Sequence, residues 1–352
     1  MLKHKKIIGS AIAMAVAAGF TAAPAIAGDL TIASWGGSYQ DAQSKAIFVP
    51  VAKAMGIKIK EETYGGISDV RLQVKAGAVT LDIIDTGSGG GARGGVEGIL
   101  EPLDYNMIDV SNFVPGTYLP ACVGTITFST VFAYNLETYK DGNVPKTWAD
   151  FFDAKKFPGK RSYRGKYHGA LEPALMADGV AKEDVYKILD SEEGIDRAIN
   201  KIRALKDDIA IFWKSGAQHA QLMKDGEVDM TTGWNGRFDV AIKDGAKAAY
   251  TYDDALLDYD CFGIPKGAPN KELAMKFLAE ASKASYQANM PKYITYGPTN
   301  KGSYELGTID AELATMLPSH PNNAANQLVL NNDWYAKWEK VAAAKYQDML
   351  TE

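Results

Sequence analysis

A glycine-rich segment is the first place in the sequence whose residue types and spacing could do chemistry. Gly89-Gly-Gly-Ala-Arg-Gly94 satisfies the pattern G-x-G-x-x-G and follows a predicted strand at Leu81–Asp85, which is the setting of a dinucleotide-binding turn. The nine residues from 87 to 95 contain six glycines, however, and a segment of that composition matches the pattern by chance. The chain has no G-x-x-x-x-G-K-[ST] phosphate loop. A nucleotide-binding enzyme stays open as one alternative function.

Residues for nucleophilic or metal chemistry are sparse. No G-x-S-x-G elbow occurs, and no histidine stands in a recognisable nucleophile arrangement, so a secreted hydrolase is a second alternative with little support. Beyond the N-terminal segment the histidines are His168, His219 and His320, and none forms a His-x-x-x-His or Cys-x-x-Cys type of metal motif. We therefore expect no metal site, no cofactor and no catalysis.

The N-terminal segment has the three parts of a secretory signal peptide. Lysines cluster within Met1–Lys6, an apolar run of small residues covers Ile7–Phe20, and the sequence Ala25-x-Ala27 follows. The apolar run is shorter than the roughly 20 residues that a membrane span needs. The pattern predicts a signal peptide at residues 1–27, cleaved after Ala27, and export to the periplasm.

Charge and length limit the classes of function that remain. Removal of three lysines with the signal peptide changes the formal net charge from −5 to −8, and an acidic chain lacks the basic face that nucleic-acid binding requires. Acidity is compatible with a cationic ligand, although surface carboxylates mainly keep a protein soluble. A mature chain of about 325 residues exceeds the size at which one core keeps growing, so two lobes are expected.

Strands alternate with helices along the chain, which predicts an α/β fold with a largely parallel sheet. Two β-rich runs, Cys122–Asn135 and Asp260–Pro265, are candidates to cross between lobes, and the tail at Ala325–Leu350 reads as a helix. The other predicted elements are strands at Leu30–Trp35, Ile57–Tyr64 and Glu227–Thr232, and helices at Asp69–Ala76, Leu171–Asp178, Lys182–Leu189, Gly194–Leu205, Ala217–Lys224 and Asn270–Ser282.

Several short segments, taken in order, give the chain a family resemblance. They are Ser34-Trp-Gly-Gly-Ser-Tyr39, Asp82-Ile-Ile-Asp85, Phe157-Pro-Gly-Lys-Arg161, Leu171-Glu-Pro-Ala-Leu-Met-Ala-Asp-Gly179, Asp225-Gly-Glu-Val228, Gly233-Trp-Asn-Gly236, Ile264-Pro-Lys-Gly-Ala-Pro269 and Tyr296-Gly-Pro-Thr-Asn300. Each is weak alone, but together they span nearly the whole mature chain. In this order they resemble the spermidine/putrescine-type periplasmic binding proteins of ABC importers.

The resemblance implies a two-lobed periplasmic binding protein fold of type II. Its discontinuous lobes would be residues 28–133 plus 261–305 and residues 134–260 plus 306–352, joined by crossing hinge strands near 130–136 and 258–264. The expected function is a monomeric receptor that captures a small amine-containing solute between the lobes. It would deliver the solute to a membrane permease and its ATPase.

The same resemblance nominates the ligand-binding residues. Ammonium groups in polyamine receptors lie between aromatic faces and carboxylates, because a desolvated cation needs compensating negative charge. Matching position by position, Asp260 corresponds to the carboxylate that takes a terminal amine, with Asp258 beside it. The aromatic positions are Trp35, Tyr39, Trp234 and Tyr296, and the candidate set is completed by Asp85, Ser88 and Arg237.

The chain departs from the polyamine receptors at two places. Where they carry a large aromatic residue after the third strand, this chain has Asp85-Thr-Gly-Ser88. Where they carry carboxylates for a central amine, it has the basic segment Tyr163–Gly169. Arg237 could hold a ligand carboxylate or pair with Asp239. A zwitterionic or carboxylate-bearing solute, such as an amino acid or a betaine, is therefore the alternative to a diamine.

The two cysteines are placed by the implied fold. Cys122 and Cys261 lie at the ends of the proposed crossing strands, which are neighbours in this fold, so we expect them to form a disulfide. Two buried free thiols are the alternative.

Overall fold

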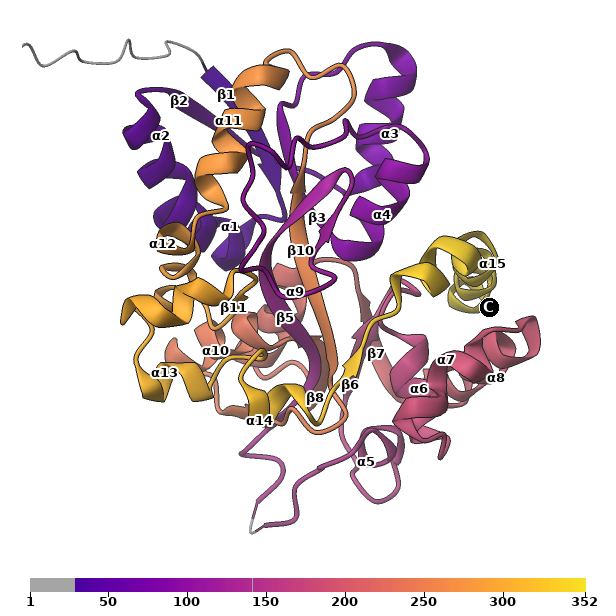
Figure 1. Ribbon diagram of the computed structural model, residues 1–352. Coiled ribbons are helices and arrows are strands. Elements are labelled where there is room, and N and C mark those ends of the chain that lie inside the picture. Colours follow the sequence, from indigo (N-terminus) through magenta and orange to yellow (C-terminus); the bar gives the residue numbers. More distant parts are fainter. Residues whose placement is uncertain (1–28, 141) are drawn as a thin grey trace, which may run out of the picture.

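The computed structural model describes residues 29–140 and 142–352, and the expected signal peptide at 1–27 lies outside this part of the chain. The described residues build one mixed sheet in the order β2-β1-β3-β10-β5-β8-β6-β7 (Figure 1). The strands of this path are β1 (Asp29–Ser34), β2 (Lys58–Thr63), β3 (Ile83–Gly87), β5 (Cys122–Asn135), β6 (Arg161–Arg164), β7 (Ile209–Trp213), β8 (Met230–Trp234) and β10 (Leu256–Gly263).

Helices cover both ends of this sheet and short strands extend its centre. The helices are α1 (Gly37–Gln43), α2 (Val49–Met55), α3 (Ile67–Ala76), α4 (Ser88–Val96), α5 (Trp148–Phe152), α6 (Leu171–Ala177), α7 (Val185–Leu189), α8 (Glu192–Ala204), α9 (Gly216–Lys224), α10 (Asn235–Lys243), α11 (Lys271–Ala281), α12 (Ala284–Gln287), α13 (Ala311–Thr315), α14 (Pro321–Ala324) and α15 (Asn332–Thr351). The short strands are β4 (Tyr118–Leu119), β9 (Ala248–Tyr250), β11 (Gly297–Pro298) and β12 (Leu328–Val329).

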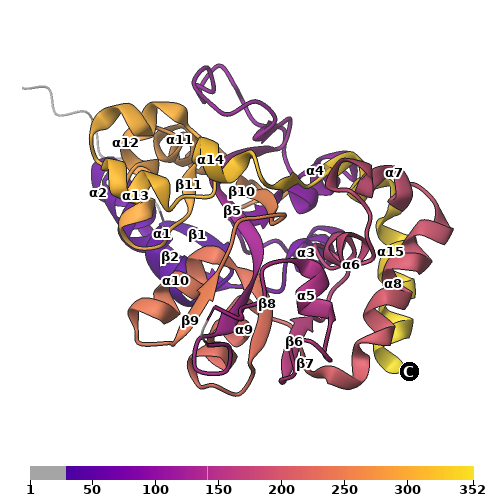
Figure 2. The ribbon, with the colours of Figure 1, turned by 90° about the horizontal axis from the view of Figure 1, so that it is seen from below.

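The two long strands β5 and β10 run antiparallel at the centre of the sheet and connect two lobes (Figures 1 and 2). On one side β10 pairs with β3, while the far half of β5 pairs with β8. The outer pairs β1–β2, β1–β3 and β6–β7 are parallel. The expected α/β fold is confirmed, but the expectation of a largely parallel sheet holds only for the outer strands, because both crossing strands run against their neighbours.

Two hydrophobic clusters lie on either side of the crossing strands. The first gathers Leu30, Ile83 and Phe277 with other residues of β1, β3 and α11. The second gathers Leu171 and Ile199 with residues of α6 and α8, together with Tyr335, Tyr346 and other residues of α15. The helix α15 therefore packs with the second lobe although it ends the chain, and both ribbon views show it alongside α8. The lobe boundaries deduced from the resemblance stay a prediction.

The helix α15 begins later than the sequence suggested. The segment before it forms the short strand β12, which pairs in parallel with β10 through Leu328 and Val329. Asn331 then accepts a hydrogen bond from the Trp334 N–H, which caps the helix N-terminus. The expected helix from Ala325 is thus wrong in its first turns, because edge pairing with β10 replaces helical hydrogen bonds there.

The glycine-rich segment forms the helix α4 instead of a nucleotide-binding turn. A Cβ atom at Gly91 would lie 2.7 Å from the sulfurs of both Cys122 and Cys261, so only glycine lets this helix approach the centre of the sheet so closely. A Cβ atom at Gly94 would likewise lie 2.6 Å from a methyl carbon of Leu100. The glycines therefore allow close packing of this helix. The alternative function of a nucleotide-binding enzyme loses its main support.

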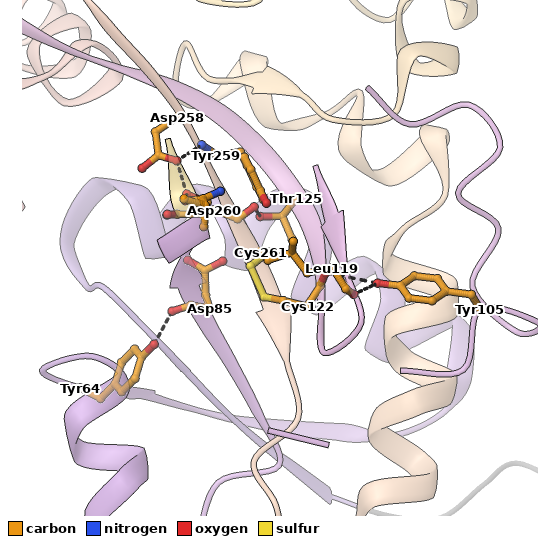
Figure 3. Close-up of a disulfide and its surroundings, with 12 residues drawn as sticks. Tyr64, Asp85, Tyr105, Leu119, Cys122, Thr125, Asp258, Tyr259, Asp260 and Cys261 are labelled. Atoms are coloured by element: carbon orange, nitrogen blue, oxygen red, sulfur yellow. Dashed lines mark hydrogen bonds between the residues drawn. A yellow bond between two sulfur atoms is a disulfide. The ribbon is translucent and has the colours of Figure 1, made fainter. Parts of the chain in front are cut away.

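Cys122 and Cys261 form a disulfide, with Cα atoms 5.6 Å apart, which is the pairing that the implied fold favoured (Figure 3). The bond joins β5 to β10 beside an irregularity where the pairing register shifts between Asp260 and Cys261. The Thr125 hydroxyl donates to the Asp260 carbonyl across this irregularity. The irregularity and the disulfide therefore join the two crossing strands directly beside Asp260.

We predict that replacing both cysteines by alanine lowers the free energy of unfolding by up to about 5 kcal/mol, since the bond closes a loop with a sequence separation of 139 residues. Urea unfolding of the variant and of the oxidised protein measures the difference. Reduced wild-type protein serves as a control because it should unfold like the variant. An unchanged unfolding midpoint in the variant would contradict this prediction.

Candidate functional site

A cavity of about 470 Å³ opens between the two lobes. Its walls come from loops that follow the strands: Trp35 follows β1, Arg164 ends β6, Trp213 ends β7 and Trp234 ends β8. Strand ends that meet at one edge of a sheet are the usual place for a binding site in α/β proteins. Both lobes therefore contribute side chains to one enclosed space.

Seven of the nine residues proposed from the sequence line this cavity, and two lie behind its wall. Asp85 is fully buried under the cavity floor, and Ser88 touches one of the lining carboxylates from behind. The seven lining residues are Trp35, Tyr39, Trp234, Arg237, Asp258, Asp260 and Tyr296. The structure thus brings the set together, while contact of each residue with a ligand stays a proposal.

Two carboxylates of β10 line one side of the cavity, and a third carboxylate, on β3, is buried next to them. Asp258 and Asp260 are two positions apart on β10, so their side chains point to the same face of the strand, and both are buried. Asp85 lies on the neighbouring strand β3, and Figure 3 shows these three acids on one side of the disulfide. Three carboxyl groups therefore gather in one buried region.

Burial changes the protonation of these acids. Loss of water raises the pKa of Asp260 to about 7, and the charge of Asp258 adds to this rise, while Arg237 opposes it. Burial also raises the pKa of Asp258 to about 6, against the effects of the Ser88 hydrogen bond and of Arg164. The pKa of Asp85 is raised well above its usual range by burial and by Asp260. Ionisation of this cluster needs a cation close by.

Arg164 and Arg237 lie close to one indole ring on the basic side of the cavity. The other basic residues of the lining are Arg93, Lys166 and Lys214. The guanidinium of Arg164 lies 5.1 Å from the ring centre of Trp234, and that of Arg237 lies 5.7 Å from it. Arg164 also lies 5.6 Å from the ring of Trp213. The Nε atoms of both arginines are buried without a hydrogen-bond partner in the described structure. Such donors are suited to an anionic group.

The expected alternative pairing of Arg237 with Asp239 is not found. Asp239 accepts hydrogen bonds from the hydroxyls of Tyr250 and Thr295 on the outer side of α10. Arg237 is 3% exposed and points the other way, where its Nη2 donates to the Gly36 carbonyl of the opposite lobe. The arginine therefore belongs to the cavity and not to the surface.

Aromatic rings form the remaining wall. Tyr39 meets Tyr296 edge-on at 5.4 Å, and Phe128 packs against both Tyr296 and Trp234. Trp35 lies 5.2 Å from Tyr64 at the opposite side of the opening. These rings supply a flat apolar surface that a hydrocarbon chain can contact and a π face that a cation can approach.

A glycine at the start of α9 makes room for this arrangement. A Cβ atom at Gly216 would lie 2.4 Å from the Trp234 ring and 2.5 Å from the Nε atom of Arg237. The backbone of α9 can therefore approach the indole and the guanidinium only because residue 216 has no side chain. The local sequence thus positions both groups against the cavity.

Sequence reasoning missed several lining residues, above all Arg164. The segment Tyr163–Gly169 was recognised as basic where polyamine receptors are acidic, but that departure was not converted into a site residue. The structure places Arg164 at the end of β6 and inside the cavity. Trp213, which the sequence places after a strand and before Lys214-Ser-Gly-Ala-Gln218 as a residue that could edge the cleft, lines the cavity as well. Phe128 also lines it, but this residue is in the middle of β5 and no local signal marks it.

Comparison with known proteins agrees with this architecture. The family model described as bacterial extracellular solute-binding protein matches residues 46–318. The chain belongs to this family. A γ-aminobutyric acid-binding protein of Pseudomonas aeruginosa is 38% identical over 304 residues, which are 86% of this chain and 85% of that protein.

Two solved structures extend the comparison. The binding protein MotA of A. tumefaciens B6, in complex with glucopine, is 41% identical and matches 91% of this chain and 99% of its own, with a TM-score of 0.89. An ABC transporter substrate-binding protein of Bradyrhizobium japonicum is 40% identical over 92% of this chain and 99% of its own, with a TM-score of 0.84. This solute-binding protein is thus the receptor component of an ABC importer, and its relatives bind solutes without being enzymes.

The specific resemblance to polyamine receptors is corrected by the same comparison. The spermidine/putrescine-binding protein PotD of Streptococcus pneumoniae is 17% identical, with a TM-score of 0.67 over 91% of this chain and 99% of its own. Identity at that level shows the shared fold alone. The quoted segments therefore identify the broader extracellular family and leave polyamine specificity without support.

Membership in the extracellular family places this solute-binding protein outside the cytoplasm. In the part of the chain that the structure describes, no helix has the length and apolar character of a membrane span. Within residues 29–140 and 142–352 no group of three or more histidines, cysteines or acids is arranged to hold a metal ion.

We predict that Asp260→Asn stabilises the ligand-free protein at about pH 8 and has a smaller effect at about pH 5. The pKa of this carboxyl is about 7 in the folded protein and 3.8 ordinarily, so the folded state retains a proton that the unfolded chain has lost. Stability from this group is therefore present at low pH and is lost as the pH rises through about 4 to about 7.

Thermal or urea unfolding at the two pH values measures this effect. Asp253→Asn is a suitable control, because that residue is exposed. An equal change in stability at both pH values, or a loss of stability at about pH 8, would show that ionisation of the buried Asp260 carboxyl does not destabilise the folded protein.

Proposed function

We propose that this receptor binds a small zwitterion that carries an amine and a carboxylate, as an amino acid does. One observation carries the proposal. Two arginines and two aspartates line the same cavity, yet in the described structure no ion pair within 4.0 Å joins Arg164 or Arg237 to Asp258 or Asp260. Buried charges are normally paired. The opposite charges of a zwitterion would compensate both sets at once.

The cavity suggests how such a solute lies. Its ammonium group would face Asp258 and Asp260, and its carboxylate would face Arg237 and Arg164. The charge of Arg164 lowers the pKa of Asp258 and that of Arg237 lowers the pKa of Asp260, so each acid has a basic group in its surroundings. The carbon chain would lie along the Trp234 ring.

The relatives support this choice of ligand class. A relative that is 38% identical is a γ-aminobutyric acid-binding protein, and γ-aminobutyric acid has one amine and one carboxylate. A diamine, favoured from the resemblance to polyamine receptors, would leave both arginines uncompensated after water has left the cavity. The zwitterionic alternative weighed in the sequence analysis is therefore the better fit.

The remaining parts of the proposal concern the mature protein and its partners. The signal peptide would be cleaved after Ala27, and a monomer would close its two lobes around the solute and deliver it to the permease and its ATPase. The predicted lobe boundaries at residues 133/134, 260/261 and 305/306 fall within or near β5 and β10 and before α13. Closure would need bending of only those crossing strands.

Isothermal titration of ligand-free protein with γ-aminobutyric acid, 1,4-diaminobutane and glycine betaine tests the ligand class. We expect γ-aminobutyric acid to bind more tightly than the diamine by at least about tenfold, since each tenfold step corresponds to about 1.4 kcal/mol. A betaine has no N–H to donate to the aspartates and should bind weakly. Tighter binding of the diamine than of the amino acid would overturn the proposal.

We predict that Arg237→Gln and Asp260→Asn each weaken binding of γ-aminobutyric acid by at least about tenfold. Removing one member of a buried charge pair leaves the other uncompensated, which typically costs about 2–5 kcal/mol. Arg203→Gln is a matched control, because that arginine pairs with Glu352 on the exposed surface.

The two variants also separate the ligand classes. Arg237→Gln should leave binding of the diamine unchanged or strengthen it, because one uncompensated arginine is removed, whereas Asp260→Asn should weaken it. If Arg237→Gln binds the amino acid as the wild type does, the carboxylate of the solute is not held where we place it.

A further inference from the structure

One buried hydroxyl connects the cavity to the C-terminal helix. The Oγ atom of Ser88 lies 2.5 Å from Oδ1 of Asp258 and 2.7 Å from Oδ1 of Asn332. Ser88 is the first residue of α4, and Asn332 is the first residue of α15. A cavity carboxylate is thus two hydrogen bonds away from a helix of the opposite lobe.

The protons of this network can be arranged in two ways. A serine hydroxyl has one hydrogen to donate, so it cannot donate to both oxygens. Either the Asp258 carboxyl is protonated and donates to Ser88, or the amide of Asn332 is turned so that its NH₂ group donates to Ser88. In the second arrangement Ser88 donates to an ionised Asp258. Ionisation of Asp258, which a bound ammonium group favours, therefore selects the orientation in which Asn332 donates.

A second polar contact joins the same two helices. Nε of Arg93 on α4 lies 2.8 Å from Oε2 of Glu339 on α15, and their side chains are 14% and 27% exposed. Nη1 of Arg93 also donates to the hydroxyl of Tyr167 in the second lobe, at 3.3 Å. Both charged side chains line the cavity. The ion pair is partly shielded from water, but its Nε–H is not aligned for a hydrogen bond, so the pair acts mainly through the attraction of its charges.

The two helices belong to different lobes. α4 packs on the disulfide through Gly91 and on Leu100 through Gly94, which holds it against the first-lobe end of β10. α15 packs with α8 and α6 through Tyr335 and Tyr346 in the second hydrophobic cluster. Figure 1 shows α15 between α4 and the second-lobe helices α7 and α8. Separation of the lobes would break both polar contacts.

We propose that the α4–α15 contact, formed by Ser88 with Asn332 and by Arg93 with Glu339, is a latch that stabilises the closed receptor and is tightened by solute bound at Asp258. This inference rests on the proposed function for the identity of the bound group. Ser88 and Asn332 act as positioning residues: they do not touch the solute, and they orient Asp258 toward it.

The latch should affect the apparent affinity for the solute through the fraction of ligand-free protein that is closed. If the solute binds the closed form, the apparent affinity falls in proportion to the closed fraction of the ligand-free protein. Loss of one partly buried polar contact changes such an equilibrium by roughly threefold to tenfold. We therefore predict that Asn332→Ala, Glu339→Gln and Ser88→Ala each weaken apparent binding of γ-aminobutyric acid by that factor.

The distance between the helices can be measured directly. Spin labels on cysteines introduced at Val96, the last residue of α4 and 86% exposed, and at the exposed Lys340 of α15 report the α4–α15 distance by pulsed electron resonance. The native cysteines are bonded to each other and take no label. The ligand-free wild type should show short and long distances, and γ-aminobutyric acid should shift them to short.

The variants then decide between a latch and a merely structural contact. Asn332→Ala, Glu339→Gln and Ser88→Ala should shift the ligand-free distribution to long distances, and the reversed pair Arg93→Glu with Glu339→Arg should restore short ones. Lys345→Gln is the matched control, since it removes an ion pair between α15 and Asp196 within the second lobe. All of these variants should unfold at nearly the wild-type temperature.

Unchanged ligand-free distributions in the three single variants overturn the latch. A wild type that neither binds γ-aminobutyric acid nor shifts with it counts against the proposed function, while the ligand-free comparison still decides the latch. Variants that shift the distances but bind the amino acid with wild-type affinity refute the link to Asp258.

Discussion

The antiparallel pairing of β5 with β10 is the constraint on which the rest of the molecule depends. These strands are shared by both lobes: β3 joins the sheet through β10, and β8 joins it through β5, and the outer strands pair in turn with β3 and β8 or with each other. Because β10 also carries Asp258 and Asp260, the strand that connects the lobes holds the acidic side of the cavity as well. The register irregularity and the disulfide keep that strand fixed where Asp260 emerges. Hinge and binding site are therefore built from the same residues.

The cavity keeps Asp258 and Asp260 apart from its arginines at positions 164 and 237 without pairing them. Aspartates stand on the central strands, and arginines stand on β6 and α10 of the second lobe, with the Trp234 ring between the two guanidinium groups. Direct pairing would neutralise the cavity and leave nothing for a solute to compensate. Because the fold holds these charges apart and unpaired, a small dipolar molecule can compensate both sets when it binds.

The sequence predicted the fold better than the ligand. Elements that show in the sequence as a regular hydrophobic pattern, such as the strand β2 and the helix α8, were predicted to within a few residues of their bounds. Trp234 and Asp260 were found because the resemblance matched them to an aromatic position and a carboxylate position of the polyamine receptors. Arg164 was not, since its function depends on β6 lying beside β7 and β8, which no local pattern encodes. The glycines of α4 could be recognised only as a cluster that matches a nucleotide-binding pattern by chance, because the sulfurs that require Gly91 belong to residues far away along the chain.

The position of Trp234 has a consequence for how solute binding can be observed. Its indole ring lies between two charged groups and shares the cavity with Trp35 and Trp213, whereas Trp148 and Trp334 are buried in the second hydrophobic cluster. The emission of an indole responds to the charges and the water around it. Half of the six tryptophans of the chain therefore lie where the proposed solute would change their surroundings. The protein contains its own fluorescent indicator of occupancy, and a simple optical titration needs no added label.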